Sequence, residues 1–215
     1  MNLLDATDRL LRGQRDDASA LRPRHLLALL VGAGFLYGLV LGCHNLRSRQ
    51  MLYSALKVPL LLTASSLVCL PNFFVVNTLL GLRDDFAIVL RGLLSAQAVM
   101  AVALASLAPL TALAYVSSAS YPMATVFNGL MFLVAALASQ ACLGRIYAPL
   151  IAARPRHRIG KASWLLLYLF VTIQLAWMLR PFIGAPGLPV TFFREGAWSN
   201  AYVVVSRAVW SLLVD

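Results

Sequence analysis

Five long apolar stretches constrain the fold of this chain more than any other feature. They run over Leu26–Cys43, Val58–Leu80, Gly92–Val116, Met123–Gly144 and Trp164–Leu179. Each is close to the length, about 17 to 25 residues, that a helix needs to cross about 30 Å of hydrocarbon. The chain is therefore predicted to be an all-α, polytopic membrane helical bundle, with five transmembrane helices and flanking interfacial helices.

The composition leaves room for one bundle and little else. Hydrophobic residues make up 60% of the 215 residues and charged residues only 12%, which is typical of membrane proteins. We expect a cytoplasmic amphipathic tail over residues 1–25, the five-helix bundle over 26–180, and a Pro- and aromatic-rich C-terminal tail over 181–215. Leucines recur at helical spacing in the first tail, which is compatible with a helix on the headgroups, a partner-binding helix or a frayed end.

The basic residues predict the orientation of the chain. The net charge is +10, but Lys and Arg lie at the ends of the apolar stretches, where they contact lipid headgroups, so we expect no nucleic-acid partner. An inside N-terminus puts twelve basic residues in the cytoplasm and six outside, with Arg47, Arg49 and Lys57 in the first outer loop. The positive-inside rule thus favours a cytoplasmic N-terminus and a periplasmic C-terminus. The preference for Arg over Lys suggests a GC-rich bacterial genome, and hence the inner membrane.

Three glycines form one face of the first stretch. Gly34, Gly38 and Gly42 are four residues apart, and the lack of side chains there lets another helix approach closely. This glycine face predicts either packing within the bundle or an interface with another subunit. Self-association or other membrane protein subunits are therefore expected partners, beside the lipids themselves.

The second stretch is expected to be broken in its middle. Pro71 cannot donate to the helix ladder, and Asn72 and Asn77 follow it. A broken helix at membrane depth exposes carbonyls that a transporter could use, whereas a simple proline kink would be satisfied by neighbouring polar groups. Just before the third stretch, Asp84 and Asp85 are expected to cap the next helix. The long amide side chains of the stretches form a candidate polar path, or else join the helices by hydrogen bonds: Asn72, Asn77, Gln97, Asn128, Gln140 and Gln174.

The C-terminal tail has an unusual composition. Pro181, Pro186 and Pro189 favour a rigid extended turn, and a run of aromatic residues follows. The apolar run Val203–Val214 is too short and too charged for a clean sixth span. The tail is compatible with an interfacial helix on the outer leaflet or with a docking surface for another subunit, and its aromatic candidates are Phe192, Phe193, Trp198 and Tyr202.

Catalytic and cofactor signatures are missing from the sequence. The three histidines lie at helix ends or in loops, and no nucleophile or metal-binding motif is present. We therefore expect no cofactor, and assign the chain first as a non-catalytic accessory or scaffold subunit of a bacterial membrane complex. A small transporter or channel using the broken second helix is the alternative, and a membrane-embedded lipid-modifying enzyme comes third.

Overall fold

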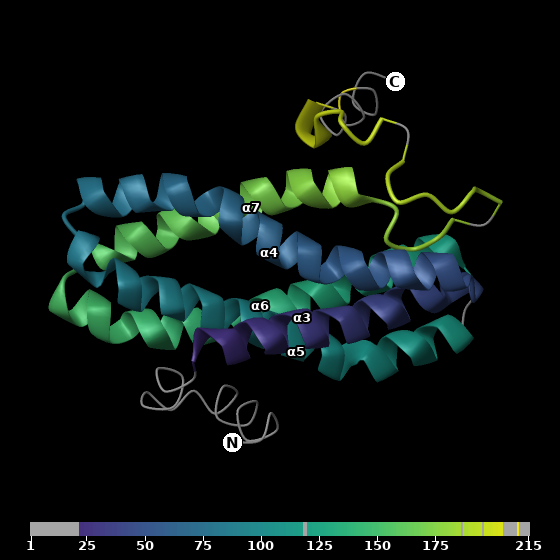
Figure 1. Ribbon diagram of the computed structural model, residues 1–215, viewed down its shortest axis with the longest axis horizontal. Helices are drawn as coiled ribbons and strands as arrows, with labels where there is room; N and C mark the ends of the chain where they lie inside the picture. Colours follow the sequence, from purple (N-terminus) through teal and green to yellow (C-terminus); the bar gives the residue numbers. More distant parts are fainter. Residues whose placement is uncertain (1–21, 118–119, 186, 195, 204–209, 211–215) are drawn as a thin grey trace.

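A computed structural model describes residues 22–117, 120–185, 187–194, 196–203 and 210. Its long helices are α3 (Pro23–Leu41), α4 (Ser48–Leu79), α5 (Phe86–Ser117), α6 (Tyr121–Ala153) and α7 (His157–Leu179), with 3-10 turns η1 (Gly42–Asn45) and η2 (Arg83–Asp85) between them. They lie along one common direction (Figure 1), and five helical segments are long and apolar enough to cross a membrane. No strand occurs among these residues. The expected all-α membrane bundle is confirmed. Of the predicted first tail, residues 1–21 lie outside the described residues, and α3 begins at Pro23, within the last residues of that tail.

The helix α4 departs most from the sequence-based expectation. It begins at Ser48, ten residues before the predicted stretch, and it continues without interruption through Pro59 and Pro71. The predicted break is therefore wrong. Each proline removes one hydrogen bond of the ladder, but the bonds on either side persist and neighbouring helices hold the backbone in place. Hydroxyl groups also accompany this part of the helix, since Thr63 Oγ1 donates to the Pro59 carbonyl at 2.7 Å.

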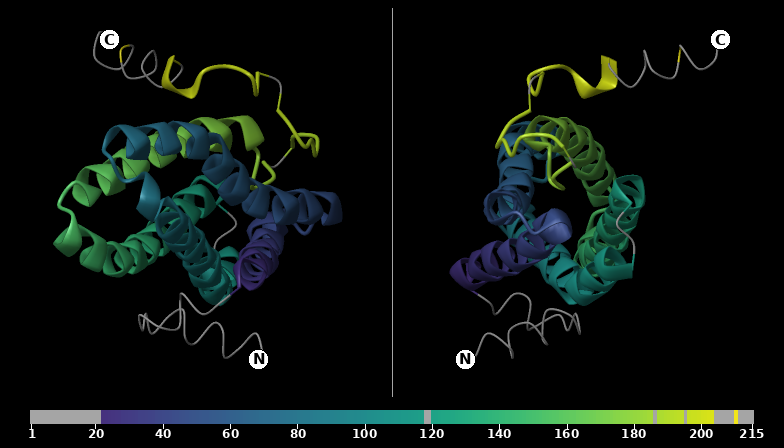
Figure 2. Two further views of the ribbon diagram at one scale, coloured as in Figure 1. Left: turned by 60° about the vertical axis from the view of Figure 1, so that its left-hand side comes forward. Right: turned by 90° about the vertical axis from the view of Figure 1, so that its right-hand side faces the viewer.

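The two halves of α4 have different neighbours. Its first half packs against the C-terminal end of α3, where a Cβ on Gly38 would meet the backbone of Ser54 and Ala55. Its second half packs against α7, and the rings of Phe73 and Trp164 stand edge to face with centroids 5.1 Å apart. Because α4 has 32 residues, it is about 48 Å long, more than one crossing requires. It therefore links the α3 side of the bundle to α7 (Figures 1 and 2).

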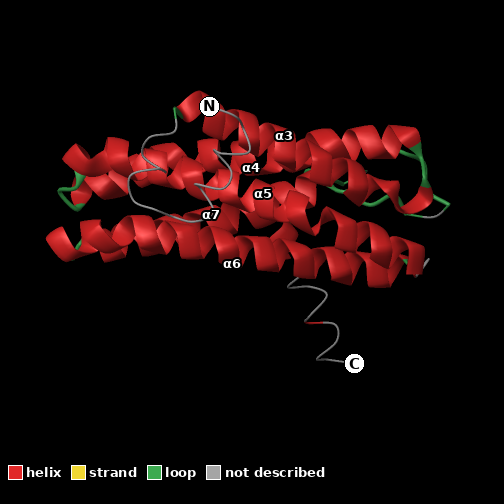
Figure 3. Ribbon diagram, turned by 90° about the horizontal axis from the view of Figure 1, so that it is seen from below, coloured by secondary structure: helices red, strands yellow, loops and turns green. Residues whose placement is uncertain are grey.

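The helices α5 and α6 form an antiparallel hairpin (Figure 1), and Figure 3 shows them side by side. Ala101 and Ala135 are fully buried in a core shared with α3 and α4. Ser139 Oγ donates to the Ala96 carbonyl across the pair at 2.8 Å. Small side chains permit this close approach, as their abundance in both stretches predicts.

An ion pair joins the loops at the end of the bundle opposite the α3–α4 turn. Asp85 Oδ2 lies 2.9 Å from His157 Nε2 and 3.5 Å from Arg154 Nη1. The Asp85 carboxylate, which was expected to cap the next helix, thus also bonds to the start of α7 and to the residue after α6. Asp84 is exposed. The pair fixes the α4–α5 turn against the α6–α7 turn.

Candidate functional site

The chain after α7 folds back over the beginning of α4. We call the described residues from 180 to 203 the C-terminal segment. Three polar side chains of α4, spaced four and three residues apart, face it: Gln50, Ser54 and Lys57. Lys57 Nζ donates to the Pro181 carbonyl at 2.8 Å, Gln50 Nε2 donates to the Phe182 carbonyl at 3.1 Å, and Ser54 Oγ donates to the same Phe182 oxygen. These bonds hold the first residues of the C-terminal segment on the bundle.

The charge count placed Lys57 in the first loop, but Lys57 lies within α4. It is nine residues inside α4 and its side chain is fully buried. The Pro181 carbonyl solvates one side of the ammonium, and the Phe192 ring lies 4.9 Å from it on another, an arrangement that stabilises a cation away from water. The turn between α3 and α4 is thus less basic than the sequence suggested.

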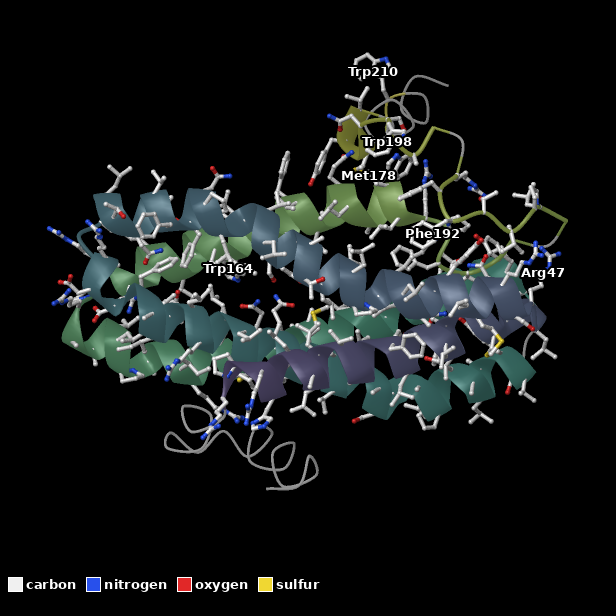
Figure 4. The ribbon with its side chains drawn as sticks, in the orientation of Figure 1. Arg47, Trp164, Met178, Phe192, Trp198 and Trp210 are labelled. Carbon is white, nitrogen blue, oxygen red and sulfur yellow. The ribbon has the colours of Figure 1, made fainter. Side chains whose placement is uncertain are left out.

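Two further contacts tie the middle of the C-terminal segment to α4. Phe192 packs edge to face against Tyr53, with centroids 5.4 Å apart. Arg47 Nη1, from the residue before α4, donates to the Leu188 carbonyl at 2.7 Å. Phe192 therefore faces inward toward α4 (Figure 4), and it is a structural anchor of the segment.

The outer part of the C-terminal segment is held by α7. The side-chain amide of Gln174 bonds both to the Ser199 carbonyl and to the Ala201 N–H, at 3.1 and 3.0 Å. Trp177 Nε1 donates to Ser199 Oγ at 3.0 Å. Tyr202 stacks on Phe170, with centroids 4.4 Å apart. The position of this segment is therefore set by side chains and not by regular secondary structure.

Among the four aromatic candidates of the tail, two are well exposed. Trp198 is 79% exposed and Phe193 is 45% exposed, with their ring centroids 6.1 Å apart. In Figure 4 Trp198 lies on the side of α7 away from the bundle. Phe192 and Tyr202 instead contact the bundle, so the structure divides the aromatic run into an inner and an outer pair. Most of the apolar run Val203–Val214 lies outside the described residues.

The glycine face packs within the chain. A Cβ on Gly38 would lie 2.4 Å from the Ser54 carbonyl oxygen, and one on Gly42 would lie 2.7 Å from Met51 Cα. A Cβ on Gly34 would meet Pro59 at 3.4 Å. Of the two interpretations of this face, the structure supports contact with α4 and leaves no room there for another subunit.

The six amide side chains occupy separate places. Asn72 is exposed, Gln140 is half-buried, and Gln174 holds the C-terminal segment. Asn77 is buried and donates to the Phe73 carbonyl of its own helix, while Gln97 accepts from Tyr168 at 3.0 Å. Within the described residues, no hydrogen bond joins two of the six. They do not form a continuous polar line.

Asn128 has the most extensive bonding of the six. Its Oδ1 accepts from Tyr37 at 3.1 Å, and its Nδ2 donates to Tyr115 at 2.7 Å. Because these tyrosines lie on α3 and α5, one amide of α6 connects three helices. The arrangement is typical of polar side chains that join membrane helices.

Several residues of the site are not evident from sequence reasoning. Gln50, Ser54 and Lys57 lie between the first two predicted apolar stretches, so sequence reasoning alone places them in a loop. Their spacing of four and three residues is a helical signal that could have extended α4. The partner of this polar face could not be inferred, since Pro181 is 124 residues away in the chain.

The fold and the buried helix contacts define a multi-pass α-helical membrane protein whose C-terminal segment packs on its own bundle. No family model, curated protein or solved structure matches the chain. Across the described residues, no group of three His, Cys, Asp or Glu side chains is placed to hold a metal ion.

Proposed function

We propose that this protein is a non-catalytic accessory subunit of a bacterial inner-membrane complex, bound by another membrane protein through the outer side of its C-terminal segment. The observation that carries this proposal is the exposure of Trp198 and Phe193 on a segment whose backbone is held by α4 and α7. A segment already held in place loses less conformational entropy on binding than a free tail. Aromatic side chains are also the residues most often found as anchors of protein interfaces.

The charge of the region favours an acidic partner. Arg180 and Arg194 belong to the same segment, and Arg47 lies against it. The acids among the described residues, Asp84 and Asp85, lie at the other end of the bundle. A partner surface with carboxylates around an apolar patch would complement both features.

The transporter alternative has little support from the described residues. It relied on a break at Pro71 and on Asn72 facing the interior, whereas α4 is continuous and Asn72 is exposed. The glycine face is no longer part of the proposed interface, because it is occupied by α4. The docking surface is therefore restricted to the C-terminal segment.

The test compares purified complexes in mild detergent. The double variant Phe193→Ala/Trp198→Ala should insert and fold normally but lose a partner that is stoichiometric with the wild-type protein. Leu166→Ala, which alters a 68% exposed residue of α7, is the matched control and should keep the partner. Wild-type protein that purifies alone, or a double variant that keeps every stoichiometric partner, would contradict the proposal.

Orientation is tested separately. Topology reporters fused after Pro155 and after Asp215 should report the cytoplasm and the periplasm respectively. The same compartment for both fusions would show that the C-terminal segment is not placed as the positive-inside rule requires.

A further inference from the structure

A pocket lies between the beginning of α4 and the C-terminal segment. Its volume is about 400 Å³, within the range of small-ligand sites. Two of the described residues that line it are arginines, Arg47 and Arg194, and none is acidic. Most of the other lining side chains are apolar, among them Leu188, Val190 and Phe193. The pocket thus combines positive charge with apolar walls.

A third arginine adds to the positive charge. The Arg180 guanidinium lies over the Trp177 ring at 3.2 Å, and its buried Nε has no hydrogen-bond partner. Burial, and then the nearby charge of Arg194, lower the pKa of Arg180. The ion pairs of the described residues involve Asp85, at the opposite end of the bundle. Arg180 and Arg194 therefore repel each other. An anion bound between Arg47 and Arg194 would relieve the repulsion between these positive charges.

Gln50 contributes an acceptor that lacks a donor. The side chain is only 1% exposed, and its Nε2 already donates to Ser54, Pro181 and Phe182. Its Oε1 is buried without a hydrogen-bond partner, which is costly unless a donor reaches it. A Cβ on Gly184, another lining residue, would lie 3.5 Å from this oxygen. The same Cβ would lie 3.1 Å from Gln50 Cγ, so a glycine at this position lets the wall of the pocket lie against the Gln50 amide.

The position of the pocket also suits a headgroup, because headgroups lie at the ends of membrane-spanning helices. Arg47 directly precedes α4 and Pro181 closely follows α7, so the site is at the ends of two membrane-length helices. Figure 4 shows Arg47 at this end of the bundle. A ligand reaching the pocket from the bilayer would bring its polar part to the arginines and its apolar part to the walls.

From these observations we infer that the pocket binds the headgroup of a membrane phospholipid whose phosphodiester is accompanied by an N–H or O–H donor. The phosphate bonds to Arg47 and Arg194, since guanidinium groups match phosphate oxygens in geometry and charge. The ammonium of an ethanolamine headgroup, or a hydroxyl of a glycerol headgroup, donates to Gln50 Oε1. A choline headgroup has no such donor and leaves that oxygen unpaired.

The test uses the full-length protein in a neutral detergent, with lipid binding followed by native mass spectrometry. Phosphatidylethanolamine and phosphatidylglycerol should each bind about tenfold more tightly than phosphatidylcholine, because only they pair with Gln50. Arg194→Gln should weaken the binding of both by about tenfold. Arg156→Gln, which removes a cation at the opposite end, is the control and should leave affinity unchanged.

Two results would overturn the inference. Equal binding of the three lipids by wild-type and Arg194→Gln protein would show that only non-specific lipid contact occurs. If inorganic phosphate at millimolar concentration displaces the lipids completely, the site is one for a free anion and not for a lipid. Among the described residues Arg194 bonds through its backbone carbonyl, which accepts from the Ala197 N–H at 3.0 Å, and Arg194→Gln keeps this bond. The replacement should therefore not alter the melting temperature, which is measured in parallel.

Discussion

Lys57 Nζ lies 2.8 Å from the carbonyl oxygen of Pro181, so a buried cation of the first half of α4 holds the chain that leaves α7. The Phe192 ring covers the same ammonium. A buried charge without a carboxylate needs such oriented dipoles, because burial in a medium of low dielectric constant is otherwise costly. This contact is one of those that hold the C-terminal segment on the bundle, together with the bonds of Gln50 and Gln174.

The first prediction concerns the reactivity of the two lysines. The chain has Lys57 and Lys161, and Lys57 is fully buried whereas Lys161 is half-buried. An amine-acylating reagent should modify Lys161 in the folded protein and Lys57 only after unfolding or after deletion of residues 180–215. Peptide mass spectrometry measures both sites in one sample. Equal labelling of the two in folded protein would mean that the C-terminal segment does not cover α4.

The second prediction concerns the contact between α3 and α4. Gly38→Ala places a methyl group 2.4 Å from a backbone oxygen of α4, and backbone cannot move aside as a flexible side chain can. It should destabilise the protein by about 1 to 3 kcal/mol. Gly32→Ala, on the same helix with nothing within 4 Å of the new methyl group, should be neutral or slightly stabilising. Thermal unfolding in detergent compares the two variants, and equal stabilities would argue against this packing.

The third prediction separates buried from exposed amides. Asn128→Leu removes hydrogen bonds to Tyr37 and Tyr115, and should lower the free energy of unfolding by about 1 to 2 kcal/mol. Asn72→Leu changes an exposed side chain and should have little effect. Denaturant titrations of both variants measure the difference. A larger loss for Asn72→Leu would favour an interior role for that residue.

The fourth prediction concerns the attachment of the C-terminal segment to α7. Gln174→Ala removes two hydrogen bonds to the backbone of Ser199 and Ala201. At about 1 kcal/mol each, their loss should raise the population of the open segment by an order of magnitude or more. Limited trypsin digestion should then cut faster after Arg194, while the bundle stays intact. Gln140→Ala is the control on α6, and the same rate of cleavage in both variants would show that the Gln174 amide does not hold the segment.

The sequence by itself determined the number and the nature of the helices. Runs of apolar residues such as Gly92–Val116 can be removed from water only within a bilayer or a large core. Five such runs exceed what a small soluble domain can bury. The small residues of α5 and α6 likewise predict their close hairpin, since side-chain size limits how near two helices approach. These are local properties, and each can be recognised within one stretch.

Only the tertiary structure decided where polar residues belong and what the glycine face contacts. The helix α4 begins at Ser48 and not at Val58 because Gln50, Ser54 and Lys57 find carbonyl partners in residues more than 120 positions away. Local composition favours a loop there, whereas the hydrogen bonds of the C-terminal segment stabilise a helix. Gly38 similarly permits close contact with any backbone, and the path of the chain supplies α4 as the neighbour. The chemistry of a side chain determines which kind of partner it needs, but only the folded chain brings that partner within hydrogen-bond distance.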